Sequence, residues 1–109
     1  MPRKPATQFL FEDVTTTGAQ TAYQLWGHVT TFHGFGNTTS GAGASVFSVE
    51  VSNDNVNWII MGTFTLVLST TVVVDGFSAV VPWRYYRGNV DSISGTGAKV
   101  SLIVGNLPA

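Results

Sequence analysis

The stretch ASVFSVEVS, residues 44–52, alternates apolar and polar side chains with a period of two. Its odd positions from Phe47 to Val51 are apolar, and the even positions from Ser48 to Ser52 are polar. Successive side chains of a β-strand point to opposite faces of a sheet, so this pattern is typical of a half-buried strand. The stretch therefore predicts a β-sheet that covers a hydrophobic core.

The same alternation recurs elsewhere, and turn-forming residues separate its occurrences. No window repeats apolar residues at the spacing of a helix. Residues 98–104 alternate again, and Gly62 marks a bend or bulge between two further strands. We expect seven or eight strands, at about residues 7–13, 20–33, 44–52, 57–62, 63–68, 70–75, 84–92 and 97–105.

Short strands at this spacing predict an all-β protein, a two-sheet β-sandwich with a jelly-roll-like or an immunoglobulin-like topology. Pattern alone does not decide the strand order. The run Gly34–Gly43 is expected to be a mobile loop, and Asp75-Gly76 a turn. One domain over residues 9–109 fits the length of 109 residues. Residues 1–8, with prolines at 2 and 5, are expected to form an extended arm or a disordered terminus.

Charge is scarce, since 10% of the residues are charged and the net charge is −1. An ordinary soluble domain has about 25% charged residues, so part of this surface is expected to be covered by partner chains. There is no basic stripe for nucleic acid and no apolar run of the length that a membrane helix needs. The chain has no cysteine, which excludes disulfides and thiolate chemistry. The basic start is not followed by the apolar run of a secretion signal.

The segment SNDNVNW, residues 52–58, is the most distinctive local signal. Asn and Asp side chains bond their own backbone and tolerate positive φ, which predicts a tight structural turn. The alternative is a ligand loop, in which Asn53, Asp54 and Asn55 would contact sugar hydroxyls. A calcium site is disfavoured, because Asp54 is the one carboxylate in the loop.

The segment PWRYYR, residues 82–87, is the densest aromatic and basic cluster. Aromatic and arginine side chains are enriched at the centres of protein interfaces, so a subunit interface is one hypothesis. The alternative is that Trp83 and Tyr86 pack in the core while the arginines lie at solvated strand edges. Stacking on single-stranded nucleic acid is disfavoured.

Motifs of catalysis are absent from the sequence. It has neither a nucleophile elbow nor a phosphate-binding loop, and Gly34-Phe35-Gly36 lacks the rest of a dinucleotide fingerprint. His28 and His33 are expected on opposite faces of a strand, and so are Glu12 and Asp13. We therefore expect no enzyme activity, no metal and no cofactor.

Residues 45–105 resemble small β-sandwich virion structural proteins of tailed bacteriophages, most closely capsid decoration (cement) proteins. The resemblance lies in VEVSNDNVNW (49–58), DGF (75–77), PWRYYRGNV (82–90) and SGTGAKV (94–100). Asp54-Asn55 stands where many such proteins would carry Asp-Gly, a small departure because Asn also tolerates positive φ.

The resemblance implies a homotrimer on the outer capsid surface, made in the host cytoplasm, that bridges neighbouring subunits of the major capsid protein. The arm would reach a capsid subunit and add a strand to a sheet edge. Its deletion, residues 1–8, should leave a folded domain that no longer attaches. The expected interface residues are Arg3, Lys4, Phe9, Phe11, Trp83, Arg84, Tyr85 and Arg87. The alternatives are a tail, neck or baseplate component, or a carbohydrate-binding module for host recognition.

Overall fold

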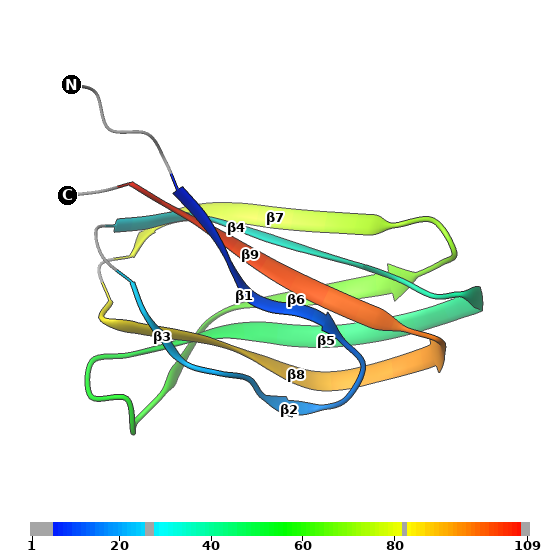
Figure 1. The fold of residues 1–109 in the computed structure, drawn as a ribbon, viewed down its shortest axis with the longest axis horizontal. Helices are drawn as coiled ribbons and strands as arrows, with labels where there is room; N and C mark the ends of the chain where they lie inside the picture. Colours follow the sequence, from blue (N-terminus) through cyan, green and yellow to red (C-terminus); the bar gives the residue numbers. More distant parts are fainter. Residues whose placement is uncertain (1–5, 26–27, 82, 108–109) are drawn as a thin grey trace.

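The computed structural model describes residues 6–25, 28–81 and 83–107, and the side chains of 7–25, 31–79 and 83–105. These residues form nine β-strands and no helix (Figure 1). The strands are β1 (Ala6–Val14), β2 (Gly18–Ala19), β3 (Tyr23–Gln24), β4 (His28–Asn37), β5 (Ser40–Ser52), β6 (Ile59–Leu68), β7 (Val73–Val81), β8 (Tyr85–Thr96) and β9 (Lys99–Leu107).

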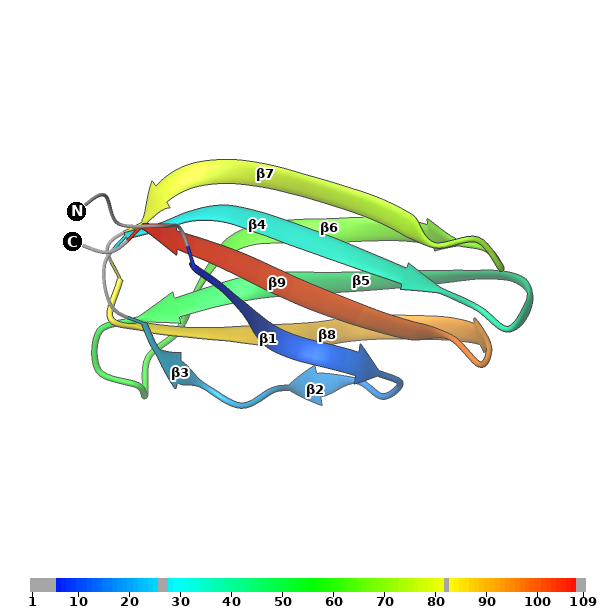
Figure 2. The same cartoon turned by 45° about the horizontal axis from the view of Figure 1, so that its top comes forward.

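Two antiparallel sheets make up the fold, which confirms the predicted all-β sandwich. One sheet has the order β1-β9-β4-β7, and the other β2-β8-β5-β6, with β3 also paired to β8 (Figure 2). Because β2 and β3 pair with successive parts of β8, they act as one interrupted strand. Counted in this way the described residues form four strands in each sheet, in a jelly-roll-like order.

Predicted strand 7–13 matches β1 to within one residue at each end, whereas predicted strand 70–75 covers only the beginning of β7. Predicted strand 44–52 is the second part of β5, and 84–92 and 97–105 lie largely within β8 and β9. Predicted strand 20–33 is divided between β3 and β4, whereas 57–62 and 63–68 are one continuous strand, β6. Val49 pairs with Gly62 and Glu50 with Ile60, so Met61 is the extra residue of a bulge.

The prediction of a mobile loop over residues 34–43 is wrong. β4 continues to Asn37 and β5 begins at Ser40. Between them Thr38 is buried, its N–H donates to Ser69 O at 2.8 Å, and its Oγ1 donates to Gly41 O at 2.6 Å. The glycines of this run create space for packing, since a Cβ at Gly34 would lie 2.7 Å from the ring of Phe47.

The predicted turn at Asp75-Gly76 is also wrong, because both residues lie inside β7. They pair with Gly34 and His33 of β4. Asx-Gly is a frequent turn signal, but β7 lies at the sheet edge, where Asp75 remains exposed to solvent. The Asp75 carboxylate accepts the N–H of Gly76 at 2.8 Å without breaking the strand.

The core lies between the inner faces of the two sheets. Phenylalanine rings dominate it: Phe47 stacks on Phe64 at a centroid distance of 5.0 Å, and Phe32 stacks on Phe77 at 4.9 Å. Aliphatic side chains fill the rest, and the buried hydrophobic residues are Leu10, Phe11, Phe32, Phe47, Val49, Val51, Phe64, Leu66, Leu68, Tyr86, Val90, Ala98, Val100, Leu102 and Val104. Phe47, Val49 and Val51 face this core, as the alternation predicts. The prediction of a half-buried strand is wrong, however, because β5 lies between β8 and β6 and its polar residues Ser48, Glu50 and Ser52 are buried as well.

Candidate interaction surface

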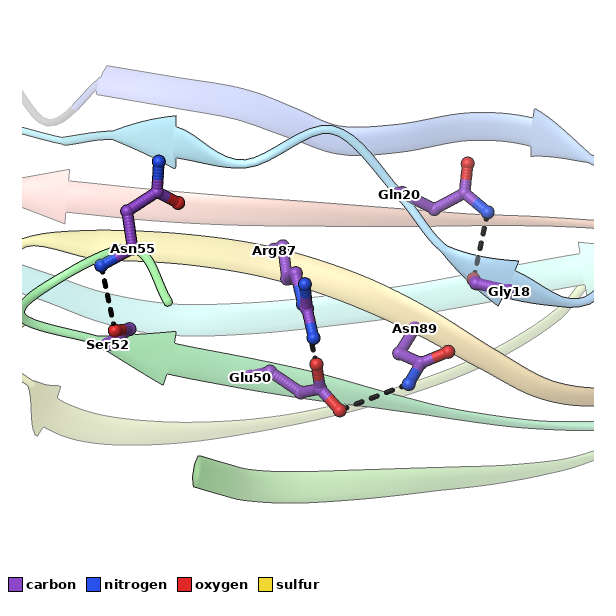
Figure 3. A network of polar contacts seen from close by, with 7 residues as sticks. All are labelled: Gly18, Gln20, Glu50, Ser52, Asn55, Arg87 and Asn89. Carbon is purple, nitrogen blue, oxygen red and sulfur yellow. Dashed lines mark hydrogen bonds and ion pairs between the residues drawn. The ribbon is translucent and has the colours of Figure 1, made fainter. Parts of the chain in front are cut away.

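The loop after β5 is organised around the carboxylate of Asp54. Its Oδ1 accepts the N–H groups of Val56 and Asn57 at 2.9 and 2.8 Å and the hydroxyl of Ser52 at 2.8 Å. Its Oδ2 accepts the side-chain amide of Asn57 at 2.7 Å. The Ser52 hydroxyl in turn accepts the N–H of Asn55, which has a positive φ of 60° (Figure 3).

These bonds hold the pKa of the Asp54 carboxyl well below its usual range, with the N–H of Asn57 contributing most. A carboxylate that already accepts four bonds has little capacity left for a sugar hydroxyl or a cation. Asn53 is also engaged, because its Oδ1 accepts the N–H of Arg84 at 3.3 Å. The loop is therefore a structural turn, as the first interpretation of the segment predicts.

The cluster before and within β8 is divided between core and surface. Tyr86 is fully buried, burial raises the pKa of its phenol, and its hydroxyl accepts the N–H of Trp83 at 3.0 Å. Trp83 and Tyr85 are partly buried, and Arg84 is exposed. Tyr86 therefore packs in the core and Trp83 is partly buried against it, as the second interpretation of the segment predicts. Arg84 is exposed, but β8 is an interior strand and not a sheet edge.

Arg87 belongs to a polar network on the outer face of the β2-β8-β5-β6 sheet (Figure 3). Its Nε donates to Glu50 Oε1 at 2.6 Å, and Asn89 Nδ2 donates to Glu50 Oε2 at 3.1 Å. The guanidinium also lies 4.2 Å from the ring centroid of Trp58. Glu50 is only 7% exposed, so Arg87 first of all neutralises a buried charge of its own chain.

Two further predicted interface residues, Phe9 and Phe11, lie on opposite faces of the other sheet. Phe11 is 6% exposed and packs edge-on against Phe47, so its ring stabilises the core and offers little area to a partner. Phe9 is 37% exposed on the outer face, with its ring 6.5 Å from that of Phe35. Arg3 and Lys4 lie outside the described residues.

Several predicted residues gather at one end of the sandwich, which we call the loop end: Asn53, Asp54, Asn55, Trp83, Arg84 and Tyr85. Ala6 pairs with Asn106, so β1 begins at this end, beside the last residues of β9 (Figure 1). The three described residues of the predicted arm, 6–8, are strand residues that pair with β9. Residues 1–5 of the predicted arm lie outside the described residues.

Exposed aliphatic side chains form a second feature that sequence analysis missed. Of the seven large hydrophobic side chains exposed among the described residues, six lie between residues 56 and 74. They are Val56, Ile59, Ile60, Val67, Val72 and Val74. Residues 55–74 also contain no charged residue, a signal that a search for long uncharged segments would have found.

Within residues 6–25, 28–81 and 83–107, no group of three or more His, Cys, Asp or Glu side chains is placed to hold a metal ion. In the same part of the chain, no helix has the length and apolar character to cross a membrane.

Comparison with known proteins gives a likeness of fold. No family model and no curated protein sequence matches this chain. Among solved structures, the chain is similar to the crystal structure of PBSX exported protein XepA, with a TM-score of 0.60 and 14% sequence identity. The match covers 95% of this chain but 37% of XepA, so the chain spans little more than a third of that protein.

Proposed function

We propose that this chain is a structural protein of a tailed-phage virion, which docks on the outside of the capsid and stabilises the shell by bridging capsid subunits. The fold is compatible with this role, since XepA, an exported protein of phage PBSX, contains a similar sandwich. The resemblance of residues 45–105 to capsid decoration proteins supports the same function.

The observation that carries the proposal is the composition of the loop end. Trp83, Arg84 and Tyr85 lie at the end of the sandwich where β1 begins. A neighbour at this end would therefore meet the aromatic and basic cluster beside the start of β1. We propose that Arg3 and Lys4 contribute positive charge to the same contact.

The proposed role needs binding and no chemistry. A protein that binds the assembled shell and not its dissociated subunits stabilises the shell by mass action. Many identical sites on one particle multiply this effect. We accordingly propose no catalytic residue and no cofactor, and the partners are the major capsid protein and further copies of this chain.

The test is addition of the purified full chain to capsids that lack it, followed by co-sedimentation, imaging and measurement of the temperature at which the shell breaks. We expect binding to the outer surface and a higher disruption temperature. Arg84→Glu should weaken binding by about tenfold or more, which is about 1.4 kcal/mol. Lys99→Glu, a charge reversal at the other end of the sandwich, should leave binding unchanged, provided that circular dichroism shows the variant to be folded after loss of the 3.9 Å contact between Lys99 and Asp13.

Two other results would reject the proposal. Sedimentation with isolated tails and not with capsids would indicate a tail, neck or baseplate component. Binding of the free chain to glycans, without binding to capsids, would indicate a carbohydrate-binding module. The hydrogen bonds that occupy Asp54 argue against glycan binding at that residue.

A further inference from the structure

The outer strands of the two sheets differ in how they are protected from pairing with another chain. Proteins commonly protect edge strands with charged residues, bulges or very short strands. β1 carries Glu12 and Asp13 and two register shifts, and β2 and β3 have two residues each. β7 carries Asp75 in its first half. Three of the four edges therefore have such a device.

The fourth edge, β6, is long and uncharged. It has ten residues, Ile59–Leu68, without a charged residue or a proline. Its bulge at Met61 protects only the beginning of the strand, because Gly62–Leu68 pair with β5 residue by residue. Since β6 is the outermost strand of its sheet, one row of its backbone N–H and C=O groups faces away from β5.

The side chains of this regular stretch are suited to a continued sheet. Phe64, Leu66 and Leu68 are buried, while Thr63, Thr65 and Val67 are exposed on the outer face. All three exposed residues are β-branched, a type that stabilises sheets through cross-strand pairs. A seven-residue segment with high β-propensity, no charge and no proline is also an aggregation hazard if it stays uncovered.

We propose that β6 pairs with β6 of a second copy of this chain, antiparallel across a two-fold axis near Thr65. Thr65 is the middle residue of Gly62–Leu68, so Thr65 would face the partner's Thr65, and Thr63 would face the partner's Val67. The β2-β8-β5-β6 sheets of the two copies would then form one continuous sheet. Ile60, at the start of one strand, lies beside the segment that follows the partner's β6.

Charge distribution makes a second copy the fitting occupant. Residues 55–74 carry no charged side chain, so pairing of two β6 edges would not remove any charge of this segment from water. Removing an unpaired charge from water is costly. The same edge on both copies satisfies the self-complementarity of a two-fold interface. The exposed aliphatic residues Ile59, Ile60 and Val67 would be shielded on both copies.

This inference rests on the proposed function for its setting, a particle on which copies of the chain assemble. It replaces the trimer that the resemblance implies with a two-fold dimer as our proposal for self-association. β6 and the loop end are different surfaces, so an experiment can reject one of the two proposals and leave the other standing.

The first experiment is sedimentation of the purified full chain over a range of concentrations. We expect a dimer, and Thr65→Lys should weaken it by about tenfold or more, because two lysines would face each other across the axis. Ser92→Lys introduces the same charge at an exposed position of the interior strand β8 and should leave the dimer intact. Circular dichroism checks that both variants are folded.

The second experiment uses the absence of cysteine from the chain. Directly opposite residues of an antiparallel pair have Cβ atoms about 5 Å apart, close enough for a disulfide after a small adjustment. Thr65→Cys should therefore form a covalent dimer on mild oxidation, whereas Ala19→Cys, exposed on β2, should not.

A monomer at all concentrations, a trimer, or a dimer that Thr65→Lys leaves intact would overturn the β6 proposal. Binding of the Thr65→Lys protein to capsids would leave the proposed function standing. A β6 dimer that binds no capsid would reject the proposed function and leave the β6 proposal standing.

Discussion

Asp54 has a larger role in its loop than an exposed carboxylate usually has. It joins Ser52, Val56 and Asn57 through hydrogen bonds that fix the path from β5 to β6. Asp54→Asn removes the negative charge and one acceptor while nearly keeping the size. We expect the melting temperature at pH 7 to fall by a few degrees, measured by circular dichroism. Asp91→Asn, an exposed position on β8, is the control and should have no effect.

The effect of Asp54→Asn on stability should depend on pH. Hydrogen bonding lowers the pKa of Asp54 in the folded state below the unfolded value of about 3.9, so the ionised carboxylate stabilises the fold. This contribution is complete well above pH 4 and is lost as the pH falls from about 4 toward the folded-state pKa. The difference in melting temperature between wild type and Asp54→Asn should shrink over that range. A difference that stayed constant down to pH 2 would contradict this account.

Arg87 neutralises Glu50 in a position from which water is largely excluded. Arg87→Met would keep much of the packing against Trp58 but leave the Glu50 carboxylate without its cation. Removing one partner of a buried pair costs 3–5 kcal/mol, and because Arg87 is 25% exposed we expect about 2 kcal/mol in urea unfolding. Arg84→Met should cost little, since Arg84 is exposed. Equal losses in both variants would mean that the ion pair contributes nothing specific.

At the scale of the strand, β8 depends on a glycine on its inner face. A Cβ at Gly88 would overlap the ring of Phe11 of β1, in the opposite sheet. Overpacking of a core commonly costs 1–3 kcal/mol, so Gly88→Ala should lower the free energy of unfolding by about 2 kcal/mol.

A double-mutant cycle identifies the cause of that loss. Phe11→Leu should reduce the overlap. The double variant Gly88→Ala/Phe11→Leu should therefore lose about 1 kcal/mol less free energy of unfolding than the two single variants lose in sum. Additive effects would show that Gly88 acts in some other way than by making room for Phe11.

At the scale of the whole molecule, residues 6–8 of the predicted arm belong to the sheet, because they pair with β9. Deletion of residues 1–5 keeps every described pair between β1 and β9, from Ala6 with Asn106 onward, so we expect the melting temperature to change little. The same deletion should weaken capsid binding by about tenfold or more in the co-sedimentation assay. A truncated chain that bound as tightly as the full chain would exclude an attachment role for the arm.

Deletion of residues 1–8, the boundary expected from the sequence, is the informative comparison. It also removes the pairs of Thr7 with Gly105 and Gln8 with Val104. It should therefore lower the melting temperature as well as weaken binding. Comparison of the two deletions then separates the loss of stability from the loss of binding.

The parts of this fold that were predictable are those in which local pattern and burial coincide. Alternation from Phe47 to Val51 identified the strand and the face that turns to the core, although Glu50 on the other face is buried as well, and the Asn-rich segment after Ser52 identified a turn. Arg87 was assigned to an interface, because nothing in the local pattern indicates that Glu50, 37 residues away, lies within 2.6 Å. Phe11 was assigned there too, although its ring packs against Phe47.

By itself the sequence determined that this chain is an all-β sandwich, because period-two alternation and turn residues act over a few neighbouring positions. Only the tertiary structure decided which strands are edges, which glycines make room for aromatic rings, and that Trp83, Arg84 and the start of β1 share one end. Those properties depend on pairing between residues far apart in the chain. The uncharged run of residues 55–74 was visible in the sequence, but its meaning depends on β6 being the outermost strand of its sheet.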